Sequence, residues 1–332
     1  MANIVYGAPY TPPVAEAPAW PGLSMQWVAK GVEWPLTNPE TGLFMLPGVR
    51  GLGSVASDRH SSSSPAVAGS RYEGSSILDR EVFWPLHMWH DGGSVEWMLR
   101  DRAFWSTMDP EDTGRWVVSH PDGAHRSLTL RFLSDGDKSS AQDPMSSGWD
   151  SYGITLIAEQ PFWEGDPVVK SWKNRTYAPF FEPDGPQLVN IAAGSDASTA
   201  TIDNPGDVES YPVWFLDGDM TDAAVGVGGV VVDVPFPIAD GECLIIDSDP
   251  DLIGATLYEI SAEEMALPAE DRKKPSERVV GIDLLNPVDM SAALGEADFA
   301  PIPAGASVPL SLTITGVGAV EALLPTRYRR PW

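Results

Sequence analysis

Glycine and proline punctuate the whole sequence, and this feature constrains the fold more than any other. The chain of 332 residues contains 31 glycines and 31 prolines. Both residues interrupt helices, glycine through its backbone entropy and proline through its missing N–H group. Long helices are therefore excluded, and the short apolar runs between Gly/Pro turns predict β-strands. We expect a mainly β protein built from two β-sandwich-like domains.

One segment departs from this pattern and predicts a short α-helix from Ser94 to about Met108. Ser94 suits the N-cap position, and Glu96 places a negative charge in the first turn, where the helix dipole favours it. Asp109-Pro110 ends the helix. The stripe expected to dock this helix onto the first domain consists of Val95, Met98, Leu99, Arg102 and Trp105.

Strands are predicted on both sides of the helix. In the first half they are 80–90, 114–118, 127–133 and 153–158, and in the second half they lie near 199–203, 211–216, 229–234, 242–247, 255–260, 278–284 and 307–315. Pro85 indicates that the strand 80–90 is an edge strand or carries a bulge. The turn Pro121-Asp122-Gly123 predicts a hairpin. The run Ser61–Ser64 predicts a flexible loop.

Charge and tryptophan are distributed unevenly, which predicts two domains. The 96 positions between Arg175 and Arg272 carry 20 acidic side chains and no basic one. Eleven of the 13 tryptophans lie at or before Trp172. The composition changes near 164–186, where Pro and Gly also accumulate. We therefore place a first domain at 1–165 and an acidic second domain at 166–332.

Composition also excludes several classes of protein. A hydrophobic fraction of 43% is that of a folded chain rather than a disordered one. No run of about 18 apolar residues predicts a membrane span, and Met1 to Tyr10 lacks the basic start and apolar core of a signal peptide. Cys243 is the single cysteine, so we expect a buried structural thiol and no disulfide framework. The formal net charge of −26 argues against a surface that holds phosphates.

Two patterns resemble metal sites but are incomplete. His87, His90 and Asp91 offer three ligands, yet the two-residue period of a strand points the histidines to different faces. Ordinary structural histidines are the expected reading. Asp247, Asp249 and Asp251 begin like a calcium loop, but Leu252 stands where the sharp turn needs Gly, and Tyr258 where a bidentate Glu is needed. We expect a surface acidic turn there, with a weak cation site as the alternative.

Other candidate chemistry is equally incomplete. Gly226–Gly229 lacks the lysine and the spacing of a phosphate-binding loop. With 47 acidic residues a glycosidase carboxylate pair is neither supported nor excluded. The tryptophans could stack on sugars, but we expect Trp97 and Trp105 to pack the helix onto a sheet and the strand tryptophans to fill the core or an interface. We therefore expect no catalytic, metal or cofactor site.

The order of the elements resembles the distal tail protein (Dit), or siphovirus tail-component, family of long-tailed bacteriophages. Gly69-Ser-Arg71 leads into the strand that opens Arg80-Glu-Val-Phe-Trp84, and a short helix ending before Pro110 follows. The hairpin strand Arg126-Ser-Leu-Thr-Leu-Arg131 and the corner Ala158-Glu-Gln-Pro161-Phe-Trp163 come next. The matching stretches of the second domain are Asn204-Pro-Gly206-Asp207, Tyr211-Pro212 through Gly218, Ala239–Asp247 and Pro303-Ala-Gly305.

This resemblance covers most of 69–332 and implies a structural role. It implies a first domain with one helix and a β-hairpin that assembles into a six-fold ring, and a galectin-like second sandwich outside the ring. The ring would link the tail tube to the baseplate or tip in the virion, after synthesis in the host cytoplasm. Its partners would be further copies of the chain, the tube protein, the tape-measure protein and the tail-associated tip or hub protein. The Pro-rich start with Pro9, Pro12, Pro13, Pro18 and Pro21 departs from smaller members.

A tail ring must let DNA pass without holding it, and carboxylates around the passage would repel the duplex. Candidates for such a lining are Asp79, Glu81, Asp91, Asp101 and Asp109. The alternative is that the excess negative charge serves solubility only. Two further functions remain open from the sequence, namely a carbohydrate-binding adhesin of β-sandwich fold and, less favoured, an acidic glycoside hydrolase.

Overall fold

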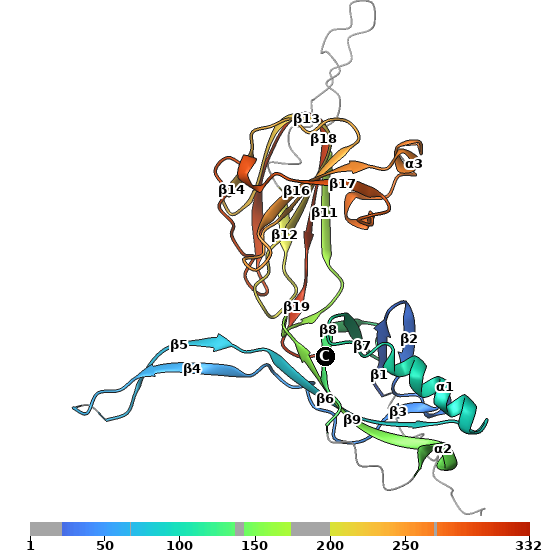
Figure 1. Ribbon diagram of the computed structural model, residues 1–332. Helices are drawn as coiled ribbons and strands as arrows, with labels where there is room; N and C mark the ends of the chain where they lie inside the picture. Colours follow the sequence, from blue (N-terminus) through green and yellow to red (C-terminus); the bar gives the residue numbers. More distant parts are fainter. Residues whose placement is uncertain (1–21, 67, 137–142, 174–199, 269–270) are drawn as a thin grey trace, which may run out of the picture.

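The structure, a computed structural model, describes residues 22–66, 68–136, 143–173, 200–268 and 271–332. Figure 1 shows two β-rich bodies joined by a narrow waist, and a long two-stranded arm that projects from the waist. Among the described residues no helix has the length and apolar character needed to cross a membrane. The Pro-rich start lies outside the described residues.

The first domain is built on a nine-stranded antiparallel sheet. Its main path runs in the order β2-β1-β7-β8-β9-β6-β3, and β10 pairs with both β8 and β19. The strands are β1 (Ser24–Ala29), β2 (Val32–Pro35), β3 (Leu43–Met45), β6 (Arg80–Trp89), β7 (Thr113–Ser119), β8 (His125–Ser134), β9 (Trp149–Ala158), β10 (Trp163–Glu164) and β19 (Arg327–Tyr328). The arm consists of β4 (Ser57–Ser62) and β5 (Arg71–Ile77).

The second domain contains an eight-stranded sheet in the order β11-β18-β13-β15-β16-β17, with β12 beside β18 and β14 beside β13. Its strands are β11 (Val168–Lys173), β12 (Thr201–Asp203), β13 (Val213–Val227), β14 (Val230–Val234), β15 (Glu242–Asp247), β16 (Gly254–Ile260), β17 (Leu284–Asp289) and β18 (Ser307–Leu324). The helices and 3-10 turns are η1 (Pro39–Thr41), α1 (Ser94–Trp105), α2 (Pro144–Ser147), α3 (Ala262–Met265), η2 (Pro275–Glu277) and η3 (Ser291–Ala293).

Tryptophan fills the core of the first domain. Strand β6 alternates strictly between buried and outward residues, as a strand with one face on a core must. The ring of Trp84 lies edge-on to Trp27 and to Trp116, with centroids 5.4 Å apart in both pairs, and Trp116 lies 5.0 Å from Trp163. The prediction that strand tryptophans form the core is therefore confirmed for these four residues.

Helix α1 forms where it was predicted, but the predicted docking stripe is wrong. Val95 and Leu99 are 59% and 56% exposed, whereas Trp97 and Phe104 are buried. These two aromatic residues are seven positions apart, which places them on one face of a helix. The helix therefore packs against the domain through the face that carries these two large rings. Trp105 lies only partly buried beside Phe132 and Tyr152.

The N-terminus of α1 also differs from the prediction. Gly93 occupies the N-cap position with a φ of 106°, and Ser94 is the first helical residue. The Ser94 hydroxyl donates to the carbonyl of Met145, at the other end of the domain's sequence. The serine therefore joins α1 to α2 instead of capping its own helix.

Pro85 is tolerated inside β6, although β6 is neither an edge strand nor bulged there. β6 pairs with β9 along its whole length, and Pro85 lies opposite Gly153. On the other side, β3 ends at Met45, and the next chain segment uses only the carbonyl of Pro85, which accepts from the Leu46 N–H at 2.7 Å. The missing N–H of proline thus falls where the ladder is already interrupted.

The second domain is a β-sandwich whose two layers share two long, bent strands. One half of β13, 213–217, pairs with β15, and the other half, 223–227, pairs with β14. The register shifts between Met220 and Asp222, opposite Gly316, whose φ of 128° favours glycine. The bend lets both halves enclose a core that is mostly aliphatic and that includes Ile202, Val225, Val232, Ile246 and Val320.

The predicted strand at 278–284 is wrong. This segment lies in a covering loop, 261–268 and 271–283, that includes α3 and η2 and packs against the second sheet beside Phe215 and Cys243. Buried charges hold it there. Arg278 donates two hydrogen bonds to the carboxylate of Asp217 at 2.8 and 2.9 Å. The polar groups within this segment break the alternation that a strand requires, and β17 begins only at its end.

Candidate functional site

Several side-chain to backbone hydrogen bonds hold the region that joins the two domains together. At its centre is Arg80, the first residue of β6, which is 4% exposed. Its guanidinium donates to the carbonyls of Pro161, Gly51 and Gly53, each at 2.6 Å, and to that of Arg329 at 2.9 Å. Burial lowers the pKa of Arg80 to about 10, which still leaves it charged at neutral pH.

The last residues of the chain return to this region. Strand β19 pairs with β10, with Tyr328 opposite Trp163. The guanidinium of Arg126 lies 3.5 Å from the centroid of the Tyr328 ring and donates to the carbonyl of Arg330 at 2.6 Å. The ring of His120 contacts the carbonyl of Pro331. Three successive carbonyls, 329 to 331, are thus each bound by a different side chain of the first domain.

Because the chain end returns to the first sheet, the two domains do not simply follow one another along the sequence. Residues 327–328 belong to the first sheet although they follow the second domain in sequence. That 1–165 and 166–332 form separate domains remains a prediction. The chain crosses the waist twice, first between β10 and β11 and again between β18 and β19.

A groove of about 1050 Å³ lies at the waist, between the domains and beside the root of the arm. Residues 77–79 at the root of the arm line it, together with loops of both domains. Its carboxylates outnumber its basic side chains, which are Arg327 and Arg329. The acidic residues are Asp79, Glu159, Glu164, Asp207, Glu209, Asp249 and Asp251.

The groove also offers apolar surface and one carboxyl group in an unfavourable setting. Leu78 and Leu252 are 47% and 66% exposed. Arg327 pairs with Asp249 at 2.5 Å. Burial raises the pKa of Glu164 above its ordinary value, although Arg327 and Arg115 partly oppose this. The excess of carboxylates over arginines gives the groove a negative field.

The predicted acidic turn at Asp247, Asp249 and Asp251 is confirmed, but only Asp251 is exposed, and Asp249 pairs with Arg327. The Asp249 N–H donates to the Asp247 carboxylate at 2.9 Å, and the Asp251 N–H to the Asp249 carboxylate at 3.1 Å. The side chains therefore cap their own turn. Within the described residues, no group of three or more His, Cys, Asp or Glu side chains is arranged to hold a metal ion.

His87 and His90 do not converge. His87 lies in an outward aromatic cluster with Phe44, Trp89 and Trp149, and it contacts the Ser151 hydroxyl at 2.9 Å. Burial lowers the pKa of His87. His90 instead accepts a hydrogen bond from the Gly92 N–H at 2.9 Å. Both are structural histidines, as expected.

Two other sequence patterns also have a structural explanation. Gly228 and Gly229 form the two-residue turn between β13 and β14, with φ of 61° and 91°, as a tight hairpin requires. Cys243 is fully buried, and burial raises the pKa of its thiol to about 12. The expected buried thiol is confirmed.

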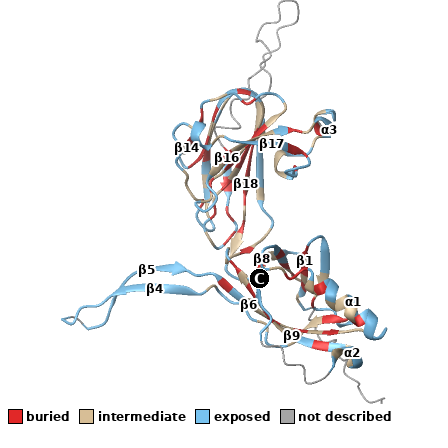
Figure 2. Cartoon of the chain, in the orientation of Figure 1, coloured by how far each residue is buried: buried red, intermediate tan, exposed pale blue. Residues whose placement is uncertain are grey.

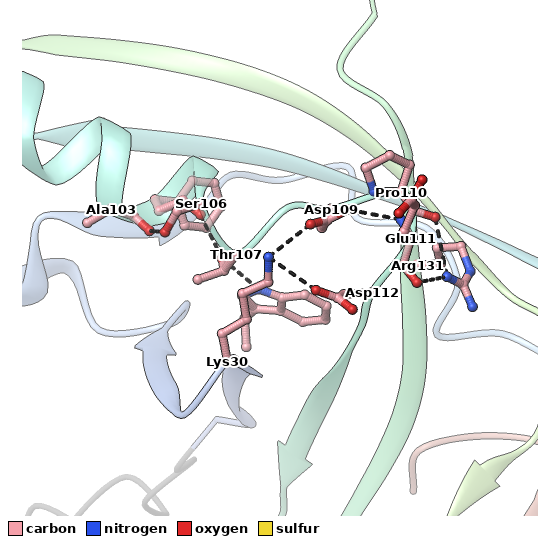
Figure 3. A network of polar contacts seen from close by, with 11 residues as sticks. Lys30, Ala103, Ser106, Thr107, Asp109, Pro110, Glu111, Asp112 and Arg131 are labelled. Carbon is pink, nitrogen blue, oxygen red and sulfur yellow. Dashed lines mark hydrogen bonds and ion pairs between the residues drawn. The ribbon is translucent and has the colours of Figure 1, made fainter.

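The five carboxylates proposed to line a passage do not form one group. Asp79 borders the groove, whereas Glu81 on β6 and Asp91 in the turn after β6 are exposed. Asp101 accepts a hydrogen bond from the Tyr152 hydroxyl. Asp109 is paired with Lys30 at 2.9 Å, and Asp112 lies 3.2 Å from the same amine (Figure 3). Asp101 and Asp109 therefore serve contacts within the domain.

The arm is the most exposed regular element in the structure (Figure 2). Every residue of β4 and β5 is exposed except Gly74, which is half-buried. The run Ser61–Ser64, predicted as a loop, contributes its first two residues to β4 and the others to the tip. Its low apolar content gave no strand signal.

Comparison with known proteins confirms the resemblance to distal tail proteins at the level of the fold. The Dit protein (gp 19.1) of phage SPP1, described as a paradigm of the hub adsorption apparatus in phages that infect Gram-positive hosts, has a TM-score of 0.57 and 12% identity. The match covers 91% of this chain and 98% of that one. A chain of the phage P2 baseplate in its activated conformation with Ca has a TM-score of 0.54 and 11% identity, with coverage of 91% and 98%. The chain therefore has a Dit-like, mainly β fold.

Sequence relatives agree with this fold. No family model matches the sequence. The minor tail protein Gp27 of Mycobacterium phage D29 is 23% identical over 224 residues, which is 64% of this chain and 63% of that protein. The minor tail protein Gp27 of Mycobacterium phage L5 is 25% identical over 162 residues, or 45% of this chain and 47% of that protein. The matched part thus spans less than two thirds of either relative.

Proposed function

We propose that this Dit-like chain is a structural protein of a long-tailed phage virion that forms a ring at the distal end of the tail tube. The ring links the tube to the baseplate or tip. The observation that carries this proposal is the fold match over 91% of the chain and 98% of the SPP1 Dit protein. The two mycobacteriophage minor tail proteins support a place in the tail.

The proposed ring contains six copies, with the first domain on the inside and a galectin-like second domain on the outside. Its further partners are the tube, tape-measure and tip or hub proteins. The proposal assigns the chain no catalytic role. The carboxylate patterns of the sequence take part in turns and ion pairs that explain them without chemistry.

Assembly is the decisive test. Sedimentation velocity and negative-stain microscopy over a range of concentrations, alone and with the cognate tube protein, are expected to show closed rings. A strictly monomeric protein under all these conditions, or open filaments only, would overturn the proposal. Monomers that bind glycans on an array would instead support the adhesin alternative.

Passage of DNA gives a second, separate test. A net charge of −26 opposes binding of a polyanion, because phosphate binding depends on cations that displace counterions. We expect no gel shift of duplex DNA even at low salt, where electrostatic affinity is greatest. Salt-sensitive binding at micromolar concentration would contradict the proposed passage of DNA through the ring.

A further inference from the structure

The Pro-rich start of the chain has a spacing that the proposed ring does not explain. Residues 1–21 lie outside the described residues, but the sequence places prolines at 9, 12, 13, 18 and 21. Pro-rich segments favour the polyproline II helix, which has three residues per turn. Residues separated by multiples of three share one face of such a helix. That face carries Pro9, Pro12, Ala15, Pro18 and Pro21, and Pro13 is the one proline outside it.

The sequence of this segment has the features of a ligand for aromatic surfaces. Pro9-Tyr-Thr-Pro12 and Pro18-Ala-Trp-Pro21 repeat the P-x-x-P spacing of segments that dock on aromatic rings. A polyproline II helix is preformed, so it loses little entropy when it binds. Glu16 is the one charged side chain in 1–21, and it lies outside the proline face. In a chain of net charge −26, an almost uncharged segment suits an apolar partner surface.

The first domain presents an aromatic surface of this kind on the outward side of β3, β6 and β9. The ring of Phe44 lies 5.6 Å from those of His87 and Trp89, and His87 lies 5.3 Å from Trp149, between centroids. The planes of His87 and Trp89 are only 28° apart. Trp149 is 41% exposed. The four rings therefore form one outward patch that a ligand can reach, and aromatic patches are typical of binding surfaces.

The first described strand begins close to this patch. The carbonyl of Met25 in β1 accepts from the Leu36 N–H at 2.8 Å, and the carbonyl of Leu36 accepts from the Met45 N–H at 2.7 Å. Met45 lies opposite Leu86 in β6, and both are sequence neighbours of rings in the patch. Three strand spacings, about 15 Å, thus separate β1 from β6. Residues 9–21 extend about 37 Å as a polyproline II helix, so the segment is long enough to cover the patch.

We propose that the proline face of residues 9–21 packs on the outward aromatic patch of the same chain, formed by Phe44, His87, Trp89 and Trp149. Proline rings lie against the aromatic rings, and the contact buries apolar surface on both sides without burying a charged side chain. The contact is made within one chain, so the inference does not depend on the proposed ring.

Electron paramagnetic resonance of the full chain tests this contact. Ala17→Cys supplies a thiol for a nitroxide label, and Cys243 is buried and does not compete for the label. Position 17 lies outside the proline face, so the label leaves that face free. The label is expected to be immobilised. A label that moves freely in the native background would overturn the inference.

Two neighbouring prolines provide a matched pair of variants. In the labelled chain Pro12→Ala removes a ring from the proline face and is expected to abolish the immobilised component of the spectrum. Pro13→Ala removes a ring outside that face and is expected to retain it. Both variants lower the proline content equally, so a general change in chain stiffness affects them alike. Equal spectra for the two variants would contradict the periodic face.

The aromatic patch is tested in the same way. Trp149→Ser in the labelled chain is expected to abolish immobilisation, whereas Leu133→Ser, at a site 53% exposed on β8, is expected to retain it. Circular dichroism should be unchanged in both variants, because both side chains are exposed. Immobilisation that survives Trp149→Ser would mean that the segment binds elsewhere, and would overturn the inference.

A mixing experiment separates a contact within the chain from one between copies. The labelled chain with native Trp149 is mixed with an excess of unlabelled Trp149→Ser chain, which keeps the total concentration and any ring constant. The label is expected to stay immobilised, since each chain uses its own patch. Loss of immobilisation in the mixture would place the segment on a neighbouring copy and would overturn the proposed contact. The state of assembly, measured by sedimentation in the same samples, reports on the ring separately.

Discussion

The two domains build their cores from different residues, and they surround their buried arginines with different hydrogen-bond partners. The first domain relies on Trp27, Trp84, Trp116 and Trp163, whereas the core of the second is mainly valine, isoleucine and leucine around Trp214. Large rings fix a few orientations through edge-on contacts. Aliphatic side chains fill the space between two sheet layers more evenly.

Their buried arginines show the same contrast. Arg80 in the first domain is surrounded by four backbone carbonyls from three chain segments. Arg278 in the second is bound by one carboxylate, Asp217. Arg80 connects chain segments that are far apart in sequence, including the chain end at the waist. The pair of Arg278 with Asp217 instead attaches one loop to the sheet beneath it.

The largest effect is expected from Trp84→Ala, which removes the ring that contacts both Trp27 and Trp116. Loss of a fully buried tryptophan should lower the free energy of unfolding by about 3–5 kcal/mol. Calorimetry should show a lower transition for the first domain alone. Trp149→Ala, at a site 41% exposed, should cost about 0.5 kcal/mol or less. Equal losses would mean that the tryptophan core does not dominate.

Asp217→Asn tests the ion pair of the second domain. Arg278 has a side chain only 3% exposed, so loss of its carboxylate leaves a buried charge unpaired and should cost about 3 kcal/mol. Glu277→Gln alters an exposed pair with Lys274 in the same covering loop and should cost about 0.5 kcal/mol or less. Chemical denaturation measures both. A similar small effect for both variants would remove the contrast between the two domains.

Gly114→Ala probes how tightly the first core is packed. A Cβ atom at this position would lie 2.2 Å from the Cη2 atom of Trp27, so the ring must move. We expect a loss of about 1–3 kcal/mol. Gly53→Ala, whose added methyl group would meet no atom within 4 Å, serves as the control. An unchanged unfolding midpoint for Gly114→Ala would show a core that adapts easily.

The smallest effect concerns the waist and depends on pH. Because burial raises the pKa of Glu164, the folded state binds its proton more tightly than the unfolded state, and stability falls as pH rises through the folded pKa. Glu164→Gln should therefore raise the melting temperature slightly at pH 7. The advantage should vanish near pH 4. A gain that is independent of pH, or one shared by Glu81→Gln on the exposed face, would contradict this explanation.

Local signals in the sequence predicted local structure well. The turn at 121–123 correctly predicted the hairpin of β7 and β8, whereas α1 ends at Trp105, before the stop predicted at Asp109-Pro110. The face of α1 was predicted wrongly, because apolar spacing fitted Val95 and Leu99 as well as the aromatic residues that are buried. The spacing of apolar residues does not show whether a large aromatic side chain or a smaller aliphatic one is buried.

The waist could not be predicted, because its contacts join residues that are remote in sequence. Arg80 and Arg329 are 249 positions apart, and no local pattern marks either of them. The arm gave no signal either, since its strands are polar and serine-rich and lack a buried face.

The return of β19 to the first sheet has a consequence for how the molecule bears force. The first described strand, β1, and the last, β19, both belong to the first sheet, so the strands of the second sheet lie between them in the sequence and are held by two chain connections. A pull on the second domain is divided between these connections, and each ends in a strand of the first domain. The same arrangement lets the second domain be exchanged for another without reordering the sheet that holds it.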